Sequence, residues 1–250
     1  MNDAFSLADR VAVVIGATGG IGAAVCRALA GAGCRVAVVF RRNPAAADAL
    51  ADTLPGSGHS TMQADVTDSA SLDRLAERLG ARVGSVDILV NSAGMTRFVP
   101  HADLQALDDA LIDEIFRTNW RGPFAAIRAL QGLLERSGRG VAINISSIAA
   151  TSGVGSNVAY CASKAALNTM TVSLARALAP AIRVVSIAPG LVDTDFIKGL
   201  DPAWRQEQAR RTPLGRLVVA DEVGQAVVAA ATLTAATGCT FVVDGGRLLA

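Results

Sequence analysis

At residues 11–22 the chain reads VAVVIGATGGIG, which is five apolar residues, a glycine-rich loop and the start of a helical pattern. A short, continuous apolar run that ends in glycine is typical of a strand buried on both faces of a parallel sheet. Glycines let the loop turn sharply and approach a ligand, and free N–H groups at the start of a helix favour an anion. The stretch therefore predicts a parallel α/β sheet that binds a dinucleotide where its first strand ends.

The glycine spacing leaves a plainer alternative open. The loop follows G-x-x-G-G-x-G rather than the common dinucleotide fingerprint G-x-G-x-x-G, and no Lys-Ser/Thr pair makes it a P-loop. A glycine-rich turn without a ligand would have the same composition. The strand–loop–helix context favours dinucleotide binding over that alternative.

The same alternation of short apolar runs and longer helical patterns continues to the end of the chain. Strands are expected at 11–15, 36–40, 61–64, 88–90, 141–145, 183–187 and 240–243, of which 61–64 is the weakest candidate. Helices are expected near 21–30, 45–54, 72–79, 108–134, 158–178 and 222–233, with Asp221 as N-cap of the last. This alternation predicts a doubly wound parallel sheet of seven strands with helices on both faces. No linker or repeat interrupts it, so residues 1–250 are expected to form a single α/β domain.

Composition excludes several classes of function. The formal net charge is +1, so there is neither a basic field for nucleic acid nor a polybasic patch for a membrane surface. The uncharged segment 223–243 contains a Thr237-Gly238 break and is expected to be a helix, a turn and a strand rather than a membrane span. The four cysteines lack metal-ligand spacing and the N-terminus lacks a signal peptide, so we expect a cytoplasmic protein without a metal site.

Polar or turn-forming residues stand at five of the predicted strand ends. Ligands of doubly wound sheets bind outside the carboxyl ends of the strands, where the strand order reverses. The residues at these ends are Gly16, Asp65, Asn91, Ser146-Ser147 and Pro189-Gly190. A binding cleft is therefore expected along this edge of the sheet.

The end of the second strand indicates which dinucleotide binds. The residue that hydrogen-bonds the ribose 2′-hydroxyl of NAD(H) would be an Asp or Glu at the end of this strand, but the chain has Phe40-Arg41-Arg42 there. Two guanidinium groups suit a 2′-phosphate, which favours NADP(H) over NAD(H). The alternative is that Arg41 and Arg42 are ordinary solvated residues after a strand.

Tyr160 and Lys164 are four residues apart on a predicted helix and share one of its faces. A cation beside a phenol favours the phenolate and moves the phenol pKa from about 10 toward the working range. The pair, with Ser147 upstream, therefore indicates acid–base chemistry on a carbon–oxygen bond. Taken alone, such a pair is more often a solvated helix face.

Together these residues resemble the short-chain dehydrogenase/reductase family, in its short single-domain branch. The resemblance runs from about Val11 to Gly246, and its motifs keep the order and spacing of the family. Ile15 replaces a threonine of the family's first motif and Ser92 replaces the second asparagine of N-N-A-G. The matched positions are 15–22, Asp65-Val66, Asn91-Ser92-Ala93-Gly94, Asn119, Ser147, Tyr160, Lys164, Pro189-Gly190, Thr194 and 242–246.

The resemblance implies a Rossmann-type fold and hydride transfer between a nicotinamide and a ketone or secondary alcohol. It implies four catalytic residues. Tyr160 would give a proton to the carbonyl oxygen and Ser147 would hold that oxygen, while Lys164 would lower the Tyr160 pKa and bind the nicotinamide ribose. Asn119 would hold a water through its backbone. With Arg41 and Arg42, the implied cofactor contacts are Gly16, Thr18, Gly20, Ile21, Gly22, Asp65, Val66, Asn91, Ala93, Gly94, Tyr160, Lys164, Pro189, Gly190, Val192 and Thr194.

The substrate stays open at this stage. Residues 191–216 are expected to form a mobile lid whose apolar side chains suit a ketone or an acyl chain. These are Phe196, Ile197, Leu200, Trp204 and Leu214, and the pocket would be completed by Met95, Phe98 and Ala149. The nearest look-alikes are 3-oxoacyl-carrier-protein reductases, for which Arg136 and Arg139 could receive an acidic carrier. A reductase of other ketones is nearly as well supported.

Two further expectations concern partners and an alternative role. The family usually forms tetramers or dimers, so we expect a homo-tetramer or homo-dimer. A non-catalytic NADP(H)-binding redox sensor or scaffold is the alternative function, and the intact set of Asn119, Ser147, Tyr160 and Lys164 argues against it.

Overall fold

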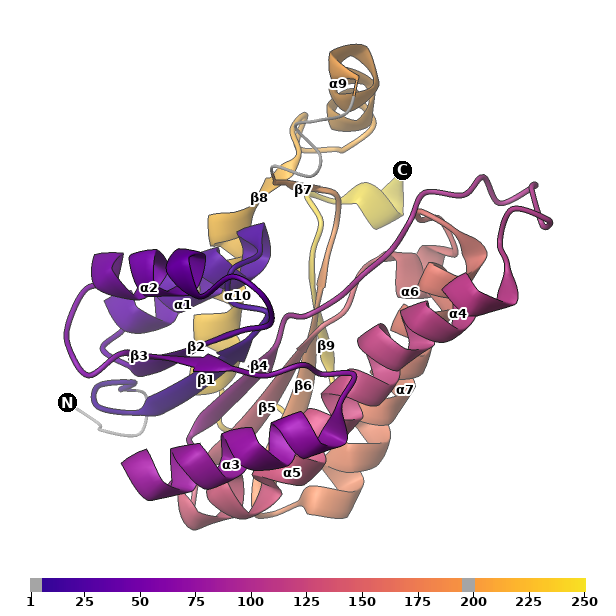
Figure 1. Cartoon of the computed structure of the whole chain (residues 1–250). Coiled ribbons are helices and arrows are strands. Elements are labelled where there is room, and N and C mark those ends of the chain that lie inside the picture. The colour runs from indigo at the N-terminus through magenta and orange to yellow at the C-terminus, as the bar shows by residue number, and fades with distance from the viewer. Residues whose placement is uncertain (1–5, 195–200) are drawn as a thin grey trace.

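The apolar runs form one parallel sheet of seven strands in the order β3-β2-β1-β4-β5-β6-β9 (Figure 1). The structure is a computed structural model, and it describes residues 6–194 and 201–250. The strands are β1 (Val11–Ile15), β2 (Arg35–Phe40), β3 (Ser60–Gln63), β4 (Ile88–Asn91), β5 (Gly140–Ile145), β6 (Ile182–Pro189) and β9 (Thr240–Val243). All seven predicted strands are present, including the weakest candidate. The five central strands are apolar runs that the sheet buries on both faces, whereas the edge strands β3 and β9 are partly exposed.

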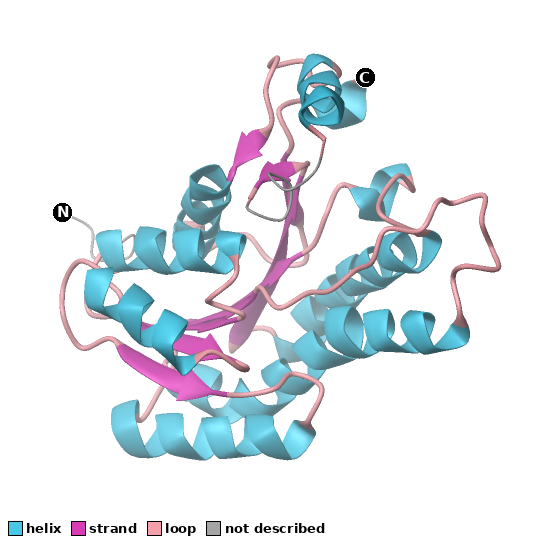
Figure 2. Ribbon diagram, turned by 45° about the horizontal axis from the view of Figure 1, so that its top comes forward, coloured by secondary structure: helices cyan, strands magenta, loops and turns pink. Residues whose placement is uncertain are grey.

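Helices cover both faces of the sheet and create two separate cores (Figure 2). One face carries α1 (Gly20–Gly31), α2 (Pro44–Thr53) and α10 (Ala220–Thr232). The other carries α3 (Ser69–Val83), α5 (Gly122–Arg136) and α7 (Val158–Leu178). Alternate residues of β1 face the two cores, with Ala12 and Val14 in the first and Val13 and Ile15 in the second. The predicted single-domain, doubly wound fold is confirmed.

The strand order reverses at β1, which pairs with β2 on one side and β4 on the other. The chain leaves β1 through the glycine loop and leaves β4 through Asn91-Ser92-Ala93-Gly94, so these two segments meet outside the sheet. Their approach is close: a Cβ on Gly16 would lie 2.6 Å from the Ala93 nitrogen, and Gly16 has a φ of +80°. Only glycine fits this position, and the crevice that doubly wound sheets use for ligands lies here.

The helix expected at 108–134 is divided in the structure. It consists of α4 (Asp109–Phe116), a π-helical turn (Arg117–Arg121) and α5. A π turn widens the helix by one residue and leaves its hydrogen-bond ladder locally irregular, which is frequent at functional sites. The structure therefore interrupts the expected helix around Asn119.

Five short elements of the described residues were not expected from the sequence, namely α6 (Ala149–Ser152), β7 (Val192–Asp193), β8 (Val218–Val219), α9 (Pro202–Arg210) and a 3-10 helix (Arg247–Leu249). The prediction that Asp221 caps α10 is wrong. The N-cap is Val219, whose N–H donates to the Glu222 carboxylate at 3.0 Å, while Asp221 lies within the first turn. The Arg216 guanidinium pairs with Glu222 and holds the pKa of that carboxyl at about 2.

The segment 223–243 divides into most of α10, a turn and β9, as predicted. Within the described ranges, no helix combines the length and the apolar character that a membrane crossing needs.

Candidate active site

Ser147, Tyr160 and Lys164 converge at the carboxyl end of β5. Ser147 follows the strand by two residues, and its hydroxyl hydrogen-bonds the phenol of Tyr160 on α7. Lys164 lies one turn further along α7, with its Nζ 5.8 Å from the centre of the Tyr160 ring. Ser147 and Tyr160 are thirteen positions apart in the chain, and the packing of α7 against the sheet brings their side chains together.

Lys164 is buried, and its ammonium is held by the sheet rather than by an acid. Its Nζ donates to the Ile145 carbonyl at 2.8 Å, and 5% of the residue is exposed. Burial without a counter-charge disfavours the ammonium and lowers the pKa of Lys164 from 10.5 to about 8. At neutral pH the side chain is still mostly a cation.

Burial, rather than the charge of Lys164, decides the direction of the Tyr160 pKa shift in the protein by itself. Burial raises the pKa of Tyr160 above its ordinary 10, and the hydrogen bond from Ser147 only partly offsets this. The physical reason is that Lys164 donates to Ile145 and lies over the ring, while desolvation of the phenolate is the larger effect. The phenol is therefore a neutral proton donor at physiological pH.

Asn119 is fully buried in the π-helical turn and binds a neighbouring loop with its side chain. Its Oδ1 accepts from the Met95 N–H at 2.8 Å, and its Nδ2 donates to the Met95 carbonyl at 3.0 Å and to Ser163 Oγ at 3.2 Å. The side chain thus fastens the loop after β4 to α7. This leaves only the backbone of the π turn for the predicted role of binding a water.

The glycine loop forms a cradle that fits a pyrophosphate. A Cβ on Gly22 would lie 2.2 Å from the Gly16 carbonyl oxygen, and one on Gly20 would lie 2.9 Å from Cγ2 of Thr194. Helix α1 begins after Gly19 without a side-chain cap and without an acidic residue in its first turn. Its first N–H groups are therefore available to an anion, which is what a dinucleotide needs at this position.

The predicted adenine end of the cleft lies beside the two arginines. Asp65 Oδ1 accepts from the Thr67 N–H and hydroxyl at 2.8 and 2.7 Å. Burial raises the pKa of Asp65, but these bonds and the charges of Arg41 and Arg42 outweigh it and lower the pKa below its usual range. Both guanidinium groups are exposed to solvent. Arg41 and Arg42 therefore lie near Asp65, with exposed positive charges that an anionic ligand could bind.

The remaining predicted cofactor residues line the same edge of the sheet. A Cβ on Gly94 would lie 3.5 Å from Asn119 Oδ1 and 3.7 Å from Lys164 Nζ, which places this motif beside the catalytic candidates. The Asn91 amide donates to Asn144 at 2.9 Å, while its buried Oδ1 has no partner among the described residues. The structure thus brings the nucleotide motif and the Tyr160 site into one continuous region.

The segment after β6 closes back onto this region. The Pro189 carbonyl accepts from the Ile148 N–H at 3.0 Å, and Gly190 lies against Asp244. Val192 is buried and pairs with Val218 in a small two-stranded sheet. Thr194, two residues further on, lies against Gly20 of the glycine loop.

The predicted lid is partly described. Phe196, Ile197 and Leu200 lie outside the described residues. Helix α9 follows and is held by an ion pair from Arg205 to Asp193 at 2.8 Å. Trp204 is 40% exposed and Leu214 is 66% exposed.

The other pocket candidates lie at different depths. Ala149 is buried, and Met95 packs partly buried beside Ile115 and Ala159. Phe98 is 72% exposed, so it does not close a pocket in this structure.

The suggestion that Arg136 and Arg139 receive an acidic carrier at the entrance is wrong. Arg136 donates to the Gly84 carbonyl, and Arg139 pairs with Asp87 at 2.8 Å. Both acceptors precede β4, at the amino ends of the strands. Helix α5 runs antiparallel to the strands, so its last turn returns to the end of the sheet away from the site.

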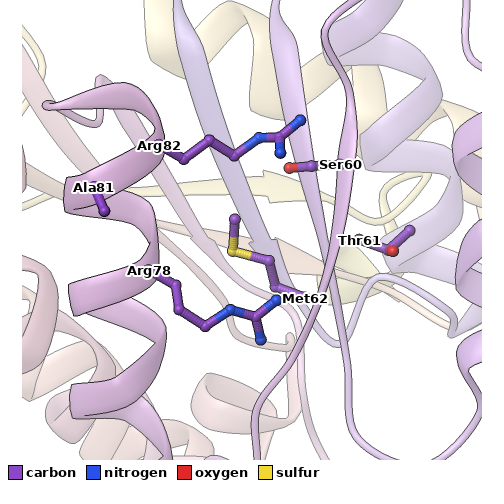
Figure 3. A pocket seen from close by; sticks show the side chains of 6 residues that line it. All are labelled: Ser60, Thr61, Met62, Arg78, Ala81 and Arg82. Atoms are coloured by element: carbon purple, nitrogen blue, oxygen red, sulfur yellow. The ribbon is translucent and has the colours of Figure 1, made fainter.

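A groove of about 340 Å³ lies at the outer edge of the sheet, between β3 and α3 (Figure 3). Arg78 and Arg82 extend from α3 across the open side of β3, toward Ser60 and Met62. Charged side chains over an edge strand protect it from pairing with another chain. The groove contains none of the predicted site residues and is not part of the candidate site.

Two residues that bind the backbone of Tyr160 were not singled out from the sequence. Asn157 is the N-cap of α7 and accepts from the Tyr160 N–H at 2.7 Å, and Ser163 donates to the Tyr160 carbonyl at 2.8 Å. An asparagine three residues before Tyr160 at the start of a helical pattern is an N-cap signal that could have found Asn157. Within residues 6–194 and 201–250, no group of three His, Cys, Asp or Glu side chains could hold a metal ion.

Comparison with known proteins agrees with this arrangement. The family model for short chain dehydrogenases matches residues 10–204. The chain is 36% identical to a putative ketoacyl reductase of granaticin polyketide synthase from Streptomyces violaceoruber, over 96% of each chain. It is 37% identical to a cis-4-hydroxycyclohexanecarboxylate dehydrogenase from Sinomonas cyclohexanicum, over 98% of each chain.

A solved structure extends the likeness to three dimensions. A putative short-chain dehydrogenase/reductase from Burkholderia xenovorans superimposes with a TM-score of 0.89 at 33% identity, covering 97% of this chain and 99% of the other. The glycine cradle at the end of β1 and the Ser147, Tyr160 and Lys164 cluster are thus set in a fold shared over nearly the whole length. The chain belongs to the short-chain dehydrogenase/reductase family of oxidoreductases.

Proposed function

We propose that this protein is an NADP(H)-dependent oxidoreductase that interconverts a ketone and a secondary alcohol. The observation that carries the proposal is the convergence of a buried neutral phenol, a hydroxyl bonded to it and a buried ammonium at the carboxyl end of β5. Such a set can hold a carbonyl oxygen and give it a proton. A non-catalytic sensor would not need it, so the alternative role is not carried further.

The residues divide the work as follows. Tyr160 gives its proton to the carbonyl oxygen, and Ser147, already bonded to the phenol, holds that oxygen in line. Lys164 keeps a positive charge 5.8 Å from the Tyr160 ring, which stabilises the phenolate left after proton transfer. Asn119 holds the loop after β4 in place through Met95 and offers its backbone to a water. The nicotinamide, when bound, supplies the hydride.

The cofactor preference rests on Arg41 and Arg42. They follow β2 where an acid would read a ribose hydroxyl, and both guanidinium groups are exposed near Asp65. A 2′-phosphate would gain charge-assisted hydrogen bonds there. The pyrophosphate would lie on Gly16 to Gly22 and the nicotinamide end between Gly94 and Thr194.

The substrate class is a moderately apolar ketone, and a 3-oxoacyl thioester is one candidate. Relatives at 36% and 37% identity are named for a ketoacyl substrate and for a hydroxycyclohexanecarboxylate, so both chemistries belong in a test. Residues 191–216 would act as the substrate lid, and α9 with Trp204 is its described part.

A substrate panel tests the proposal directly. The purified protein is offered 3-oxoacyl thioesters, cyclic ketones and hydroxy acids with NADPH or NADP⁺, and with NADH or NAD⁺, while the nicotinamide absorbance is followed. Turnover of at least one carbonyl with a lower KM for NADPH than for NADH is expected. Binding of NADPH without turnover across the panel would contradict the proposal, and a preference for NADH would contradict the cofactor assignment.

We also propose a cytoplasmic homo-tetramer or homo-dimer. Large apolar side chains are exposed on neighbouring helices at Trp120, Val158 and Val172, and Val242 is 51% exposed on the edge strand β9. Such patches are often covered by another subunit. Light scattering on the purified protein gives the mass, and a monomer of 25.5 kDa would contradict the expectation.

A further inference from the structure

The loop Met95–Arg97 runs beside the start of α7 and is bound to it through buried side chains. On one side, Asn119 holds both backbone groups of Met95 and donates to Ser163, which in turn donates to the Tyr160 carbonyl. The loop is therefore connected to the C=O of Tyr160. A second connection reaches its N–H.

The second connection is Asn157, which is 0% exposed. Its Oδ1 accepts from the Tyr160 N–H at 2.7 Å, and its Nδ2 donates to the Arg97 carbonyl at 2.7 Å and to Thr96 Oγ1 at 3.2 Å. The side-chain amide of Asn157 thus accepts a hydrogen bond from Tyr160 with its oxygen and donates two hydrogen bonds to the loop 95–97 with its nitrogen. A residue that served only as a helix cap would need the acceptor alone.

Further bonds beside Asn157 make the junction rigid. The hydroxyls of Thr96 and Ser156 hydrogen-bond one another, and the Val99 N–H donates to the Ser156 carbonyl at 2.8 Å. The loop and the residue before the N-cap are therefore joined on both sides of Asn157.

We infer that Asn157 is a positioning residue that sets the place of the Tyr160 phenol by tying the first turn of α7 to the loop 95–97. This inference rests on the proposed function, since it assigns the phenol a reacting partner. The loop also continues from Gly94, which lies beside Asn119 and Lys164. Asn157 therefore keeps the proton donor in register with the nucleotide end of the cleft as well as with its own helix.

The expected effect follows from the geometry of proton transfer. A misplacement of about 1 Å at a reacting group can lower a rate by about a hundredfold. Asn157→Ala removes the cap and the tie together, and we expect kcat to fall about 10- to 100-fold with the KM for NADPH within about twofold of the wild type. A lower kcat with a nearly unchanged KM for NADPH indicates a misplaced phenol rather than a lost cofactor site.

The variant Asn157→Ser keeps the N-cap of α7 but removes the hydrogen bonds to the loop 95–97. Serine is as good an N-cap as asparagine, but its hydroxyl is too short to reach the Arg97 carbonyl while it caps Tyr160. We expect the melting temperature to recover most of its loss while kcat stays low. Recovery of kcat along with the melting temperature would overturn the tie to the loop.

A variant of similar stability at a distant place is the control. Arg183 binds four carbonyl groups at the end of α10, at the amino end of β6, and Arg183→Met should destabilise the fold without moving Tyr160. If Arg183→Met lowers kcat as much as Asn157→Ala at the same fraction folded, the effect is a general loss of stability and the inference fails.

One readout needs no turnover, because Tyr160 is the only tyrosine in the chain. Tyrosine labelled with ¹³C at Cζ gives a single resonance whose pH titration reports this phenol. Its pKa is raised by burial in the wild type, and in Asn157→Ala it should move down toward 10 as the first turn loosens. An unchanged titration and an unchanged kcat would overturn the inference. If the wild type turns over no carbonyl, the proposed function fails, and the titration still decides whether Asn157 positions Tyr160.

Discussion

The Nζ of Lys164 lies 5.8 Å from the centre of the Tyr160 ring but donates its hydrogen bond to the Ile145 carbonyl, at the end of β5. The charge is thus near the phenol and anchored to the sheet. Because both groups are buried, the phenol is held neutral and the ammonium is weakened. The pair is set to release a proton and to tolerate the phenolate that remains.

Tyr160→Phe should abolish turnover while NADPH binding is largely kept, since phenylalanine preserves the ring and removes only the proton donor. A general acid contributes about a hundredfold or more to the rate. Steady-state kinetics on the best substrate of the panel and a fluorescence titration with NADPH measure the two effects. A variant that keeps more than about a hundredth of the wild-type kcat would refute the general-acid role.

Lys164 should make the stability of the fold depend on pH in a defined direction. Its pKa is about 8 in the folded protein and 10.5 in the unfolded chain, so between these values only the unfolded chain holds the proton. Raising the pH through this window therefore stabilises the fold, by up to about 3 kcal/mol.

Urea unfolding of the wild type and Lys164→Met at pH 7, 8, 9 and 10 measures this effect of Lys164. The difference between the two proteins removes the contributions of other groups, such as the buried thiols of Cys26 and Cys34. The free energy of unfolding of the wild type should rise relative to the variant as the pH increases. A difference that stays constant would show that Lys164 keeps its ordinary pKa.

Replacing Arg41 and Arg42 together by alanine should weaken NADPH binding and leave NADH binding nearly unchanged. A hydrogen bond to a charged group is worth about 1.5–3 kcal/mol, so the KM for NADPH should rise about tenfold or more. Arg176→Ala, an exposed arginine in the last turn of α7, is the matched control. Equal changes in both KM values would mean that the arginines do not read a 2′-phosphate.

Arg183→Met should lower stability without changing catalysis. The guanidinium donates to the carbonyls of Ala230, Ala231, Leu233 and Ala236, at and just after the end of α10, where a helix leaves carbonyls without intrahelical partners. Losing a charged donor to partly buried carbonyls costs about 1–3 kcal/mol. Chemical denaturation gives the loss, and kcat measured below the new transition should equal the wild-type value. A drop in kcat under those conditions would show that the end of α10 affects the site.

Local patterns along the chain were sufficient for the fold and for most of the cleft. The strands were predictable because buried parallel strands leave continuous apolar runs, and the glycine loop because only glycine fits the approach of Gly16 to Ala93. The family resemblance assigned Ser147, Tyr160 and Lys164 their separate roles. No spacing rule joins residues that are thirteen positions apart on two elements.

Other features depended on which elements pack together. The pKa of Tyr160 rises because the folded chain removes water from the phenol. The residues next to Tyr160 in the sequence do not reveal this burial. Arg136 and Arg139 lie away from the site because α5 runs antiparallel to the strands. Phe98, apolar enough for a pocket, is exposed because nothing in the described structure covers it.

The sequence by itself therefore determined the parallel sheet, the glycine loop and the choice of candidate catalytic side chains, because these depend on hydrophobic runs, glycine geometry and short spacings. Only the tertiary structure decided how the phenol is protonated and what holds it. Burial raises the pKa of Tyr160. Asn157 directly, and Asn119 through Ser163, connect the Tyr160 backbone to the loop 95–97, about 60 residues earlier in the chain. Desolvation and long-range hydrogen bonds arise only when distant segments meet.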